Sequence, residues 1–101
     1  MSLNQSPRYL ITGASSGIGE ELARQLAKKG YIIGLVARRK ERLNTLKEEL
    51  SKSSGKVFIH AVDLANEIET TKAFTKLVSA MGGLDGIILN AGVGRDDLKA
   101  P

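Results

Sequence analysis

Hydrophobic positions along the chain alternate between short continuous apolar runs and longer stretches with helical spacing. The apolar runs predict strands at 8–12, 31–37, 56–62 and 84–89. Helices are predicted between them: one follows the glycine-rich segment 13–19, one covers about 40–53, and one begins after Asn66. Alternating strands and helices of this kind favour an α/β domain with a parallel sheet.

The spacing of apolar residues also predicts which helix faces are buried. In the first predicted helix the apolar face contains Ile18, Leu22, Ala23 and Leu26, and Gly30 ends the helix. In the second it contains Leu43, Leu46 and Leu50. In the third, between the N-cap Asn66 and the stop at Gly82-Gly83, the expected buried residues are Ile68, Phe74, Leu77, Val78 and Met81.

A glycine-rich segment joins the first predicted strand to the first predicted helix, and it reads Thr12-Gly13-Ala14-Ser15-Ser16-Gly17-Ile18-Gly19. The first amides of a helix lack intrahelical partners, and the helix dipole adds positive charge there, so such a junction suits a phosphate group. The spacing G-x-x-x-G-x-G differs from the general dinucleotide pattern G-x-G-x-x-G. A turn with a purely structural role is the alternative interpretation.

This segment resembles the cofactor loop of the short-chain dehydrogenase/reductase family, and three later segments agree with that family in order and distance. The resemblance covers essentially the whole chain but only the N-terminal half of a family member. It implies a partial three-layer, doubly wound parallel sheet of the Rossmann type with strand order 3-2-1-4, whose last strand leaves an open apolar edge. It also implies a cofactor loop of Gly13, Ser15, Ser16, Gly17, Ile18 and Gly19, in which the serines bind phosphate oxygens, Ile18 packs beside the nicotinamide and Gly19 allows close helix–sheet packing.

Arg38 and Arg39 follow the second predicted strand, where a dinucleotide-binding domain normally has a carboxylate for the ribose 2′-hydroxyl. The planar guanidinium of arginine suits a 2′-phosphate, which a carboxylate would repel. We therefore expect NADP(H) rather than NAD(H). The alternative is a pair of solvated arginines at the start of a helix.

Two further segments carry roles implied by the resemblance. Asp63 and Leu64, after the third predicted strand, would hold the adenine ring, although an aspartate beside a helix cap is the alternative. Asn90, Ala91 and Gly92 close the fourth predicted strand, where they would support the sheet and contact the adenosine ribose. Leu89 replaces the first asparagine of the pattern that is common in the family.

The family's catalytic tyrosine, with a lysine four residues later, has no counterpart in this sequence. Tyr9 has glycine at that position, and Tyr31 has leucine. His60 alternates with apolar residues in a predicted edge strand, so we expect a surface or helix-facing role rather than catalysis. The chain should therefore bind cofactor and be inactive by itself, as the cofactor-binding half of an enzyme that interconverts a small carbonyl compound and an alcohol.

Length and composition limit the alternatives. A chain of 101 residues with 42% hydrophobic and 26% charged residues predicts one globular domain, partial and spanning 1–101. The net charge of +4 is scattered among glutamates, which argues against nucleic-acid binding. The absence of cysteine, of an apolar run long enough for a bilayer, and of a signal-peptide pattern favours a cytoplasmic protein that binds no membrane and no thiolate metal. The complete enzyme is expected to be a homo-oligomer. A free-standing nucleotide-binding or interaction module without catalysis is the second hypothesis.

Overall fold

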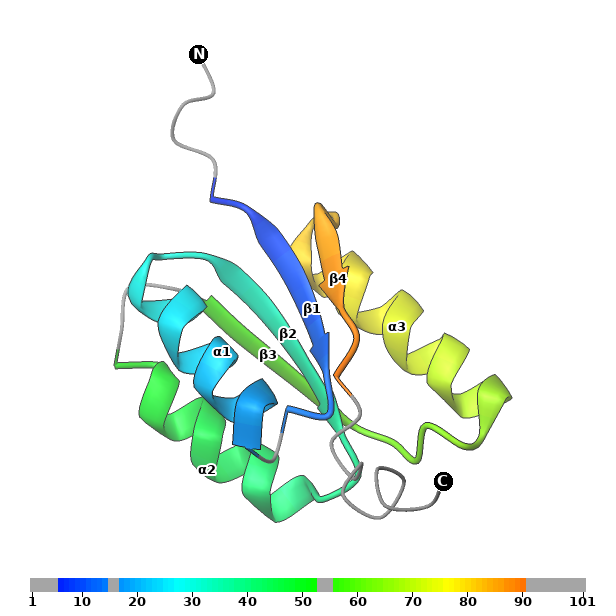
Figure 1. The fold of residues 1–101 in the computed structure, drawn as a ribbon. Coiled ribbons are helices and arrows are strands. Elements are labelled where there is room, and N and C mark those ends of the chain that lie inside the picture. Colours follow the sequence, from blue (N-terminus) through cyan, green and yellow to red (C-terminus); the bar gives the residue numbers. More distant parts are fainter. Residues whose placement is uncertain (1–5, 15–16, 53–55, 91–101) are drawn as a thin grey trace, which may run out of the picture.

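The computed structural model describes residues 6–14, 17–52 and 56–90, in which strands and helices alternate along the chain. The elements are β1 Arg8–Thr12, α1 Gly17–Lys28, β2 Ile32–Ala37, α2 Lys40–Leu50, β3 Lys56–Ala61, α3 Glu67–Met81 and β4 Gly86–Ile88. Figure 1 shows one twisted sheet with α1 and α2 on one face and α3 on the other. The predicted α/β class is confirmed.

The four strands form one parallel sheet in the order β3-β2-β1-β4, as predicted. β1 is central, with Leu10 opposite Gly34 of β2 and Ile87 of β4. The elements begin or end within a few residues of the predicted bounds. The prediction for α2 was too long, because the helix ends at Leu50 and the N–H of Ser51 closes it by donating to the Lys47 carbonyl at 2.8 Å.

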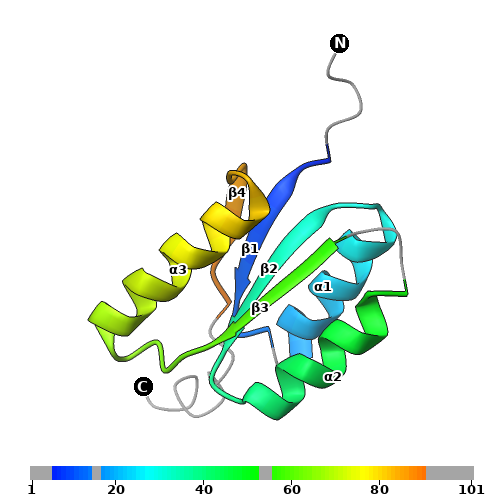
Figure 2. The ribbon, with the colours of Figure 1, turned by 180° about the vertical axis from the view of Figure 1, so that it is seen from behind.

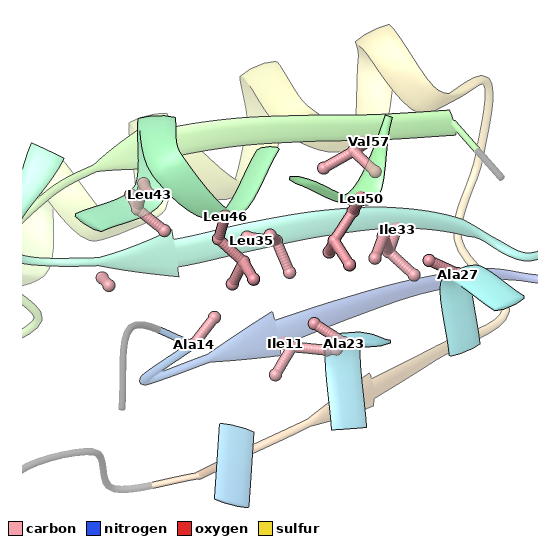
Figure 3. Close-up of a cluster of buried hydrophobic side chains, with 11 residues drawn as sticks. Ile11, Ala14, Ala23, Ala27, Ile33, Leu35, Leu43, Leu46, Leu50 and Val57 are labelled. Carbon is pink, nitrogen blue, oxygen red and sulfur yellow. The ribbon is translucent and has the colours of Figure 1, made fainter. Parts of the chain in front are cut away.

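Two apolar clusters lie on opposite faces of the sheet, because successive strand residues point to opposite sides. Ile11 of β1 belongs to the cluster beneath α1 and α2, whereas Leu10 belongs to the cluster beneath α3. Figure 3 shows the first cluster, in which Leu43, Leu46 and Leu50 of α2 point toward the sheet as predicted. Figure 2 shows α3 from behind, along the opposite face. The sheet is therefore covered on both sides, as in a doubly wound fold.

Of the predicted face of α1, Ala23 is buried and Leu22 and Leu26 pack partly buried against the core, but Ile18 does not. The buried residues are Gly19, Ala23 and Ala27, spaced four apart, whereas Ile18 is 71% exposed. Because these three residues are small, the backbone of α1 approaches the sheet closely. A Cβ at Gly19 would lie 2.4 Å from the Gly13 carbonyl oxygen and 2.7 Å from Asn90 Nδ2. The close packing expected at Gly19 is therefore present.

α3 has the predicted ends, and of its predicted face Leu77 and Met81 are buried while Phe74 and Val78 pack partly buried against the same cluster. The Asn66 side chain accepts a hydrogen bond from the Glu69 N–H at 3.0 Å, and Gly82, with φ of 84°, ends the helix. Ile68 is 69% exposed, so the prediction that it is buried was wrong. At 100° per residue, Ile68 lies far around the helix from the buried residues, which are Ala73, Leu77 and Met81.

Arg8 connects the start of β1 to the segment between α3 and β4. Its backbone N–H donates to Asp85 Oδ2 at 2.7 Å, and its Nε donates to the Met81 carbonyl at 3.0 Å. The Asp85 N–H donates to the Arg8 carbonyl in return, at 2.8 Å. These contacts join the start of β1 to the segment just before β4, and the paired residues of β4 begin at Gly86 rather than at the predicted residue 84.

β4 lies at an edge of the sheet, and among the described residues no strand pairs with its outer side. Ile87 is 43% exposed and Leu89 is 77% exposed. Ile87 shares a face with its β1 partner Leu10, which belongs to the α3-side cluster, whereas Ile88 packs against the opposite cluster. The expected apolar edge strand is therefore present.

We expect Asn66→Ala to lower the free energy of unfolding by about 1 kcal/mol, because the variant leaves the Glu69 N–H without its cap. Urea denaturation of the purified chain measures this loss. The matched control is Asn44→Ala in the exposed middle of α2, where alanine is the better helix former and stability should not fall. Equal losses in the two variants would contradict the capping role.

We expect Gly19→Ala to destabilise the fold by about 1–3 kcal/mol through overpacking, which exceeds the gain of at most about 1 kcal/mol in helix propensity. The added Cβ meets the backbone oxygen of Gly13, which cannot yield easily. In the control Gly34→Ala, the Cβ meets the flexible Met81 side chain at 2.7 Å from Sδ, so the loss should be smaller. Denaturation midpoints of both variants test this order, and a Gly19→Ala protein as stable as the parent would disprove it.

Candidate functional site

The carboxyl ends of the four parallel strands meet at one edge of the sheet, the lower edge in Figure 1. Ligands of open α/β sheets bind at this edge. Each predicted site residue in the described part of the chain follows one of these strand ends, and these residues are Gly13, Gly17, Ile18, Gly19, Arg38, Arg39, Asp63, Leu64 and Asn90. Ser15, Ser16, Ala91 and Gly92 lie outside the described residues.

The glycine turn after β1 has the backbone conformation that requires glycine. Gly13 has φ of 66° and Gly17 has φ of 44°, both in the left-handed region that side chains disfavour. A Cβ built at Gly17 would meet no atom within 4 Å, so there is open space at the start of α1. The N-terminus of a helix is the end at which anionic groups are favoured.

Asn90 joins the end of β4 to the glycine turn. Its backbone N–H donates to Thr12 Oγ1 at 2.9 Å, and the same hydroxyl donates to the Asn90 carbonyl at 3.3 Å. Its side-chain Nδ2 donates to the Gly13 carbonyl at 3.1 Å. The carbonyl of the turn is thus held from the neighbouring strand, which is the supporting role expected for Asn90.

Thr12 is a site residue whose role was not predicted from the sequence. It is 4% exposed at the last position of β1, and its hydroxyl both accepts and donates a hydrogen bond. A buried hydroxyl at the end of a strand that is covered on both faces needs a partner, so its position was the available signal. The partner itself, 78 residues away, could not be inferred from local pattern.

Arg38 and Arg39 are exposed at the end of β2, and Lys40 begins α2. Arg39 is the N-cap residue, and its side chain makes no capping hydrogen bond. Three successive cations thus lie at the positive end of a helix dipole, where anions are favoured and cations are not. Glu41, in the first turn of α2, is the next residue along the chain and carries the opposite charge.

Asp63 and Leu64 follow β3 at the same edge. Asp63 Oδ1 accepts a hydrogen bond from the Ala65 N–H at 3.0 Å, and its carbonyl accepts one from the Asn66 N–H at 2.9 Å. These bonds match the alternative interpretation of an aspartate that shapes the loop before α3. The carboxylate has a second oxygen that can accept from a ligand. Leu64 is 38% exposed and presents an apolar surface beside it.

His60 is half-buried on the edge strand β3. Within ranges 6–14, 17–52 and 56–90, no group of three histidine, aspartate or glutamate side chains is arranged to hold a metal ion. In the same ranges, no helix has both the length and the apolar character needed to cross a membrane.

The residues at this edge fit a dinucleotide. The open helix N-terminus beside Gly17 suits a pyrophosphate, the arginines suit a further phosphate, and Leu64 offers an apolar contact for a base. The chemical types of these groups match the phosphates and the base of a dinucleotide, and the groups follow adjacent strands of one sheet.

Comparison with known proteins gives consistent results. A family model described as short chain dehydrogenase matches residues 8–100. An uncharacterized oxidoreductase of Mycobacterium tuberculosis is 41% identical over 90 residues, which cover 87% of this chain and 36% of that protein.

Two solved structures have similar folds. L-sorbose reductase of Gluconobacter frateurii, in complex with NADPH and L-sorbose, is 40% identical with a TM-score of 0.78, and the match covers 87% of this chain and 34% of the reductase. An NADH-dependent reductase complexed with NAD is 28% identical with a TM-score of 0.77, and that match covers 86% of this chain and 36% of the reductase.

The chain thus spans about a third of the length of these relatives, 34–36% in each case, which is less than the half expected from the resemblance. The family match extends over nearly the whole sequence, and the strand order and the glycine turn agree with it. This chain belongs to the short-chain dehydrogenase family.

Proposed function

We propose that the chain is the nucleotide-binding domain of an NADP(H)-dependent oxidoreductase, which transfers hydride between the cofactor and a small carbonyl compound or alcohol. Membership of an oxidoreductase family supports the type of chemistry. The assignment of residues 1–101 as one partial NADP-binding domain belongs to the same proposal.

The observation that carries the choice of NADP(H) is the run Arg38-Arg39-Lys40 at the start of α2. A 2′-phosphate placed there interacts favourably with the guanidinium groups and with the helix dipole. The end of β2 and the two arginines after it contain no carboxylate, and the next acidic residue along the chain is Glu41. No acidic side chain at the end of this strand is therefore present to bind a 2′-hydroxyl or repel the 2′-phosphate. Among similar structures one was solved with NADPH and another with NAD, so the family by itself does not decide the cofactor.

The remaining site residues have supporting roles in this proposal. The turn from Gly13 to Gly19, with Ser15 and Ser16, binds the pyrophosphate, and Ile18, which is 71% exposed, packs beside the nicotinamide. Asp63 and Leu64 hold the adenine, and Asn90, with Ala91 and Gly92, contacts the ribose and holds the Gly13 carbonyl. When bound, the nicotinamide ring supplies or accepts the hydride. The residues of this chain bind and orient the cofactor.

A second candidate function is a free-standing nucleotide-binding or interaction module without catalysis. The exposed apolar residues Ile87 and Leu89 on the edge strand β4 favour it, because an uncovered apolar edge promotes association. A stable dimer of the purified chain would support this module. A cytoplasmic location, and a homo-oligomeric state of the complete enzyme, stay predictions.

We expect Arg38→Asp to weaken NADPH binding by about 1–3 kcal/mol, because it replaces a charge-assisted contact with repulsion. NADH binding should hold or improve, because the new carboxylate can accept a hydrogen bond from the ribose 2′-hydroxyl. Calorimetric titration with both nucleotides measures the difference. The control Lys47→Asp makes the same charge change near the far end of α2 and should leave NADPH binding intact. NADH binding as tightly as NADPH in the unaltered chain would refute the NADP preference.

We expect the purified chain to show no turnover of NADPH with any carbonyl compound. Neither tyrosine has a lysine four residues later, so this sequence lacks the proton donor that the family resemblance implies. The absorbance of NADPH in the presence of a panel of aldehydes and ketones measures turnover. Sustained oxidation by a chain of verified mass would overturn the expectation.

A further inference from the structure

A partly exposed ion pair joins α1 to α2, which lie on the same face of the sheet. Arg24 of α1 donates from Nε to Glu49 Oε2 of α2 at 2.8 Å, and from Nη2 to Glu49 Oε1 at 3.4 Å. Two contacts between one guanidinium and one carboxylate fix orientation as well as distance. Figures 1 and 2 both show α1 and α2 side by side on one face, so this pair is a direct link between them.

The side chain of Arg24 is held by its own helix as well. It lies 3.3 Å from Glu20 and 3.5 Å from Glu21, and it is 34% exposed. The hydrogen bond from Arg24 holds the pKa of the Glu49 carboxyl below its ordinary value, so the pair is ionised at neutral pH. A network with fixed geometry constrains its members more than an isolated surface pair does.

The packing between the two helices explains why this link matters. The buried residues of α1 are Gly19, Ala23 and Ala27, which have little side-chain surface to offer α2. A cleft of about 320 Å³ lies between the helices, and its lining includes Glu20, Arg24, Thr45, Leu46 and Glu49. Leu22 and Leu26 of α1 pack partly buried against the cluster that contains the α2 leucines, and the Arg24–Glu49 pair links the helices beside the cleft.

Each of these helices starts at one of the proposed phosphate sites. α1 starts at Gly17 in the glycine turn, and α2 starts directly after Arg38 and Arg39. The separation between the two sites depends on the pairing of β1 with β2, where the Ala14 N–H donates to the Val36 carbonyl at 3.3 Å, and also on the position of α1 relative to α2. A nucleotide that binds both sites at once does so best when the distance between the sites stays constant.

We propose that Arg24 is a positioning residue for cofactor choice: through Glu49 it fixes α1 against α2, and so holds the glycine turn and the two arginines at the spacing required by NADPH. This inference rests on the proposed function. NADPH carries a pyrophosphate for the start of α1 and a 2′-phosphate for the arginines before α2, whereas NADH lacks the 2′-phosphate. Loosening the pair therefore weakens NADPH binding more than NADH binding, so the affinity ratio reports positioning.

The test uses two variants that each remove one carboxylate from Arg24. Glu49→Ala removes the partner on α2, and Glu21→Ala removes a partner on α1 and leaves the link between helices intact. We expect Glu49→Ala to lower the NADPH-to-NADH affinity ratio about threefold, in the range that exposed ion pairs reach, and Glu21→Ala to leave the ratio unchanged. Calorimetric titration of the purified chain with each nucleotide gives both affinities.

Arg24→Met keeps the apolar stem of the side chain and provides a second route to the same loss. It should lower the ratio as Glu49→Ala does, and the double variant should add no further loss, because both changes break the same contact. Thermal unfolding of each variant shows whether the fold is retained.

Three outcomes would count against the inference. An unchanged ratio in Glu49→Ala and Arg24→Met, with NADPH still bound, overturns the positioning role and leaves the proposed function standing. A parallel fall in both affinities together with a lower melting temperature shows a merely structural role and overturns it as well. An unaltered chain that is folded and binds neither nucleotide overturns the proposed function itself.

Discussion

The close approach of α1 to the ends of β1 and β4 is the constraint on which the candidate site at the carboxyl ends of the strands depends. Gly19 leaves no room for a Cβ beside the Gly13 carbonyl and the Asn90 side chain. In that space Asn90 Nδ2 reaches the Gly13 carbonyl, and Thr12 exchanges two hydrogen bonds with the Asn90 backbone. The Gly13 carbonyl and the end of β1 are thus held by a neighbouring strand.

α2 and α3 differ in the charged residues at their N-termini. α3 begins with the cap Asn66 and carries Glu67 and Glu69 in its first turn, which stabilises the helix dipole. α2 instead begins after two arginines and has no side-chain cap. Glu41 in the first turn of α2 offsets part of this positive charge, and under the proposed function a bound phosphate would offset more of it. Departures from local rules are expected at functional sites.

The sequence predicted the strand order, the helix caps of α3 and the class of the site, but two details of burial were wrong. Ile18 and Ile68 were expected in the core and are both exposed. Periodicity identifies an apolar face, but a small-residue stripe such as Gly19, Ala23 and Ala27 has low hydrophobicity and is easily overlooked beside larger neighbours. The size of those residues, rather than their polarity, selected the face that meets the sheet.

Taken alone, the sequence determined the alternation of strands and helices, the glycine turn and the arginines after β2, because each is written in neighbouring residues. The tertiary structure decided that Asn90 holds the carbonyl of Gly13, 77 residues away, and that Arg24 bonds Glu49 across two helices. It also decided that β4 pairs over only Gly86–Ile88, after Arg8 engages Asp85. These contacts join segments that are distant along the chain, so they depend on how closely the elements pack, which no local periodicity encodes.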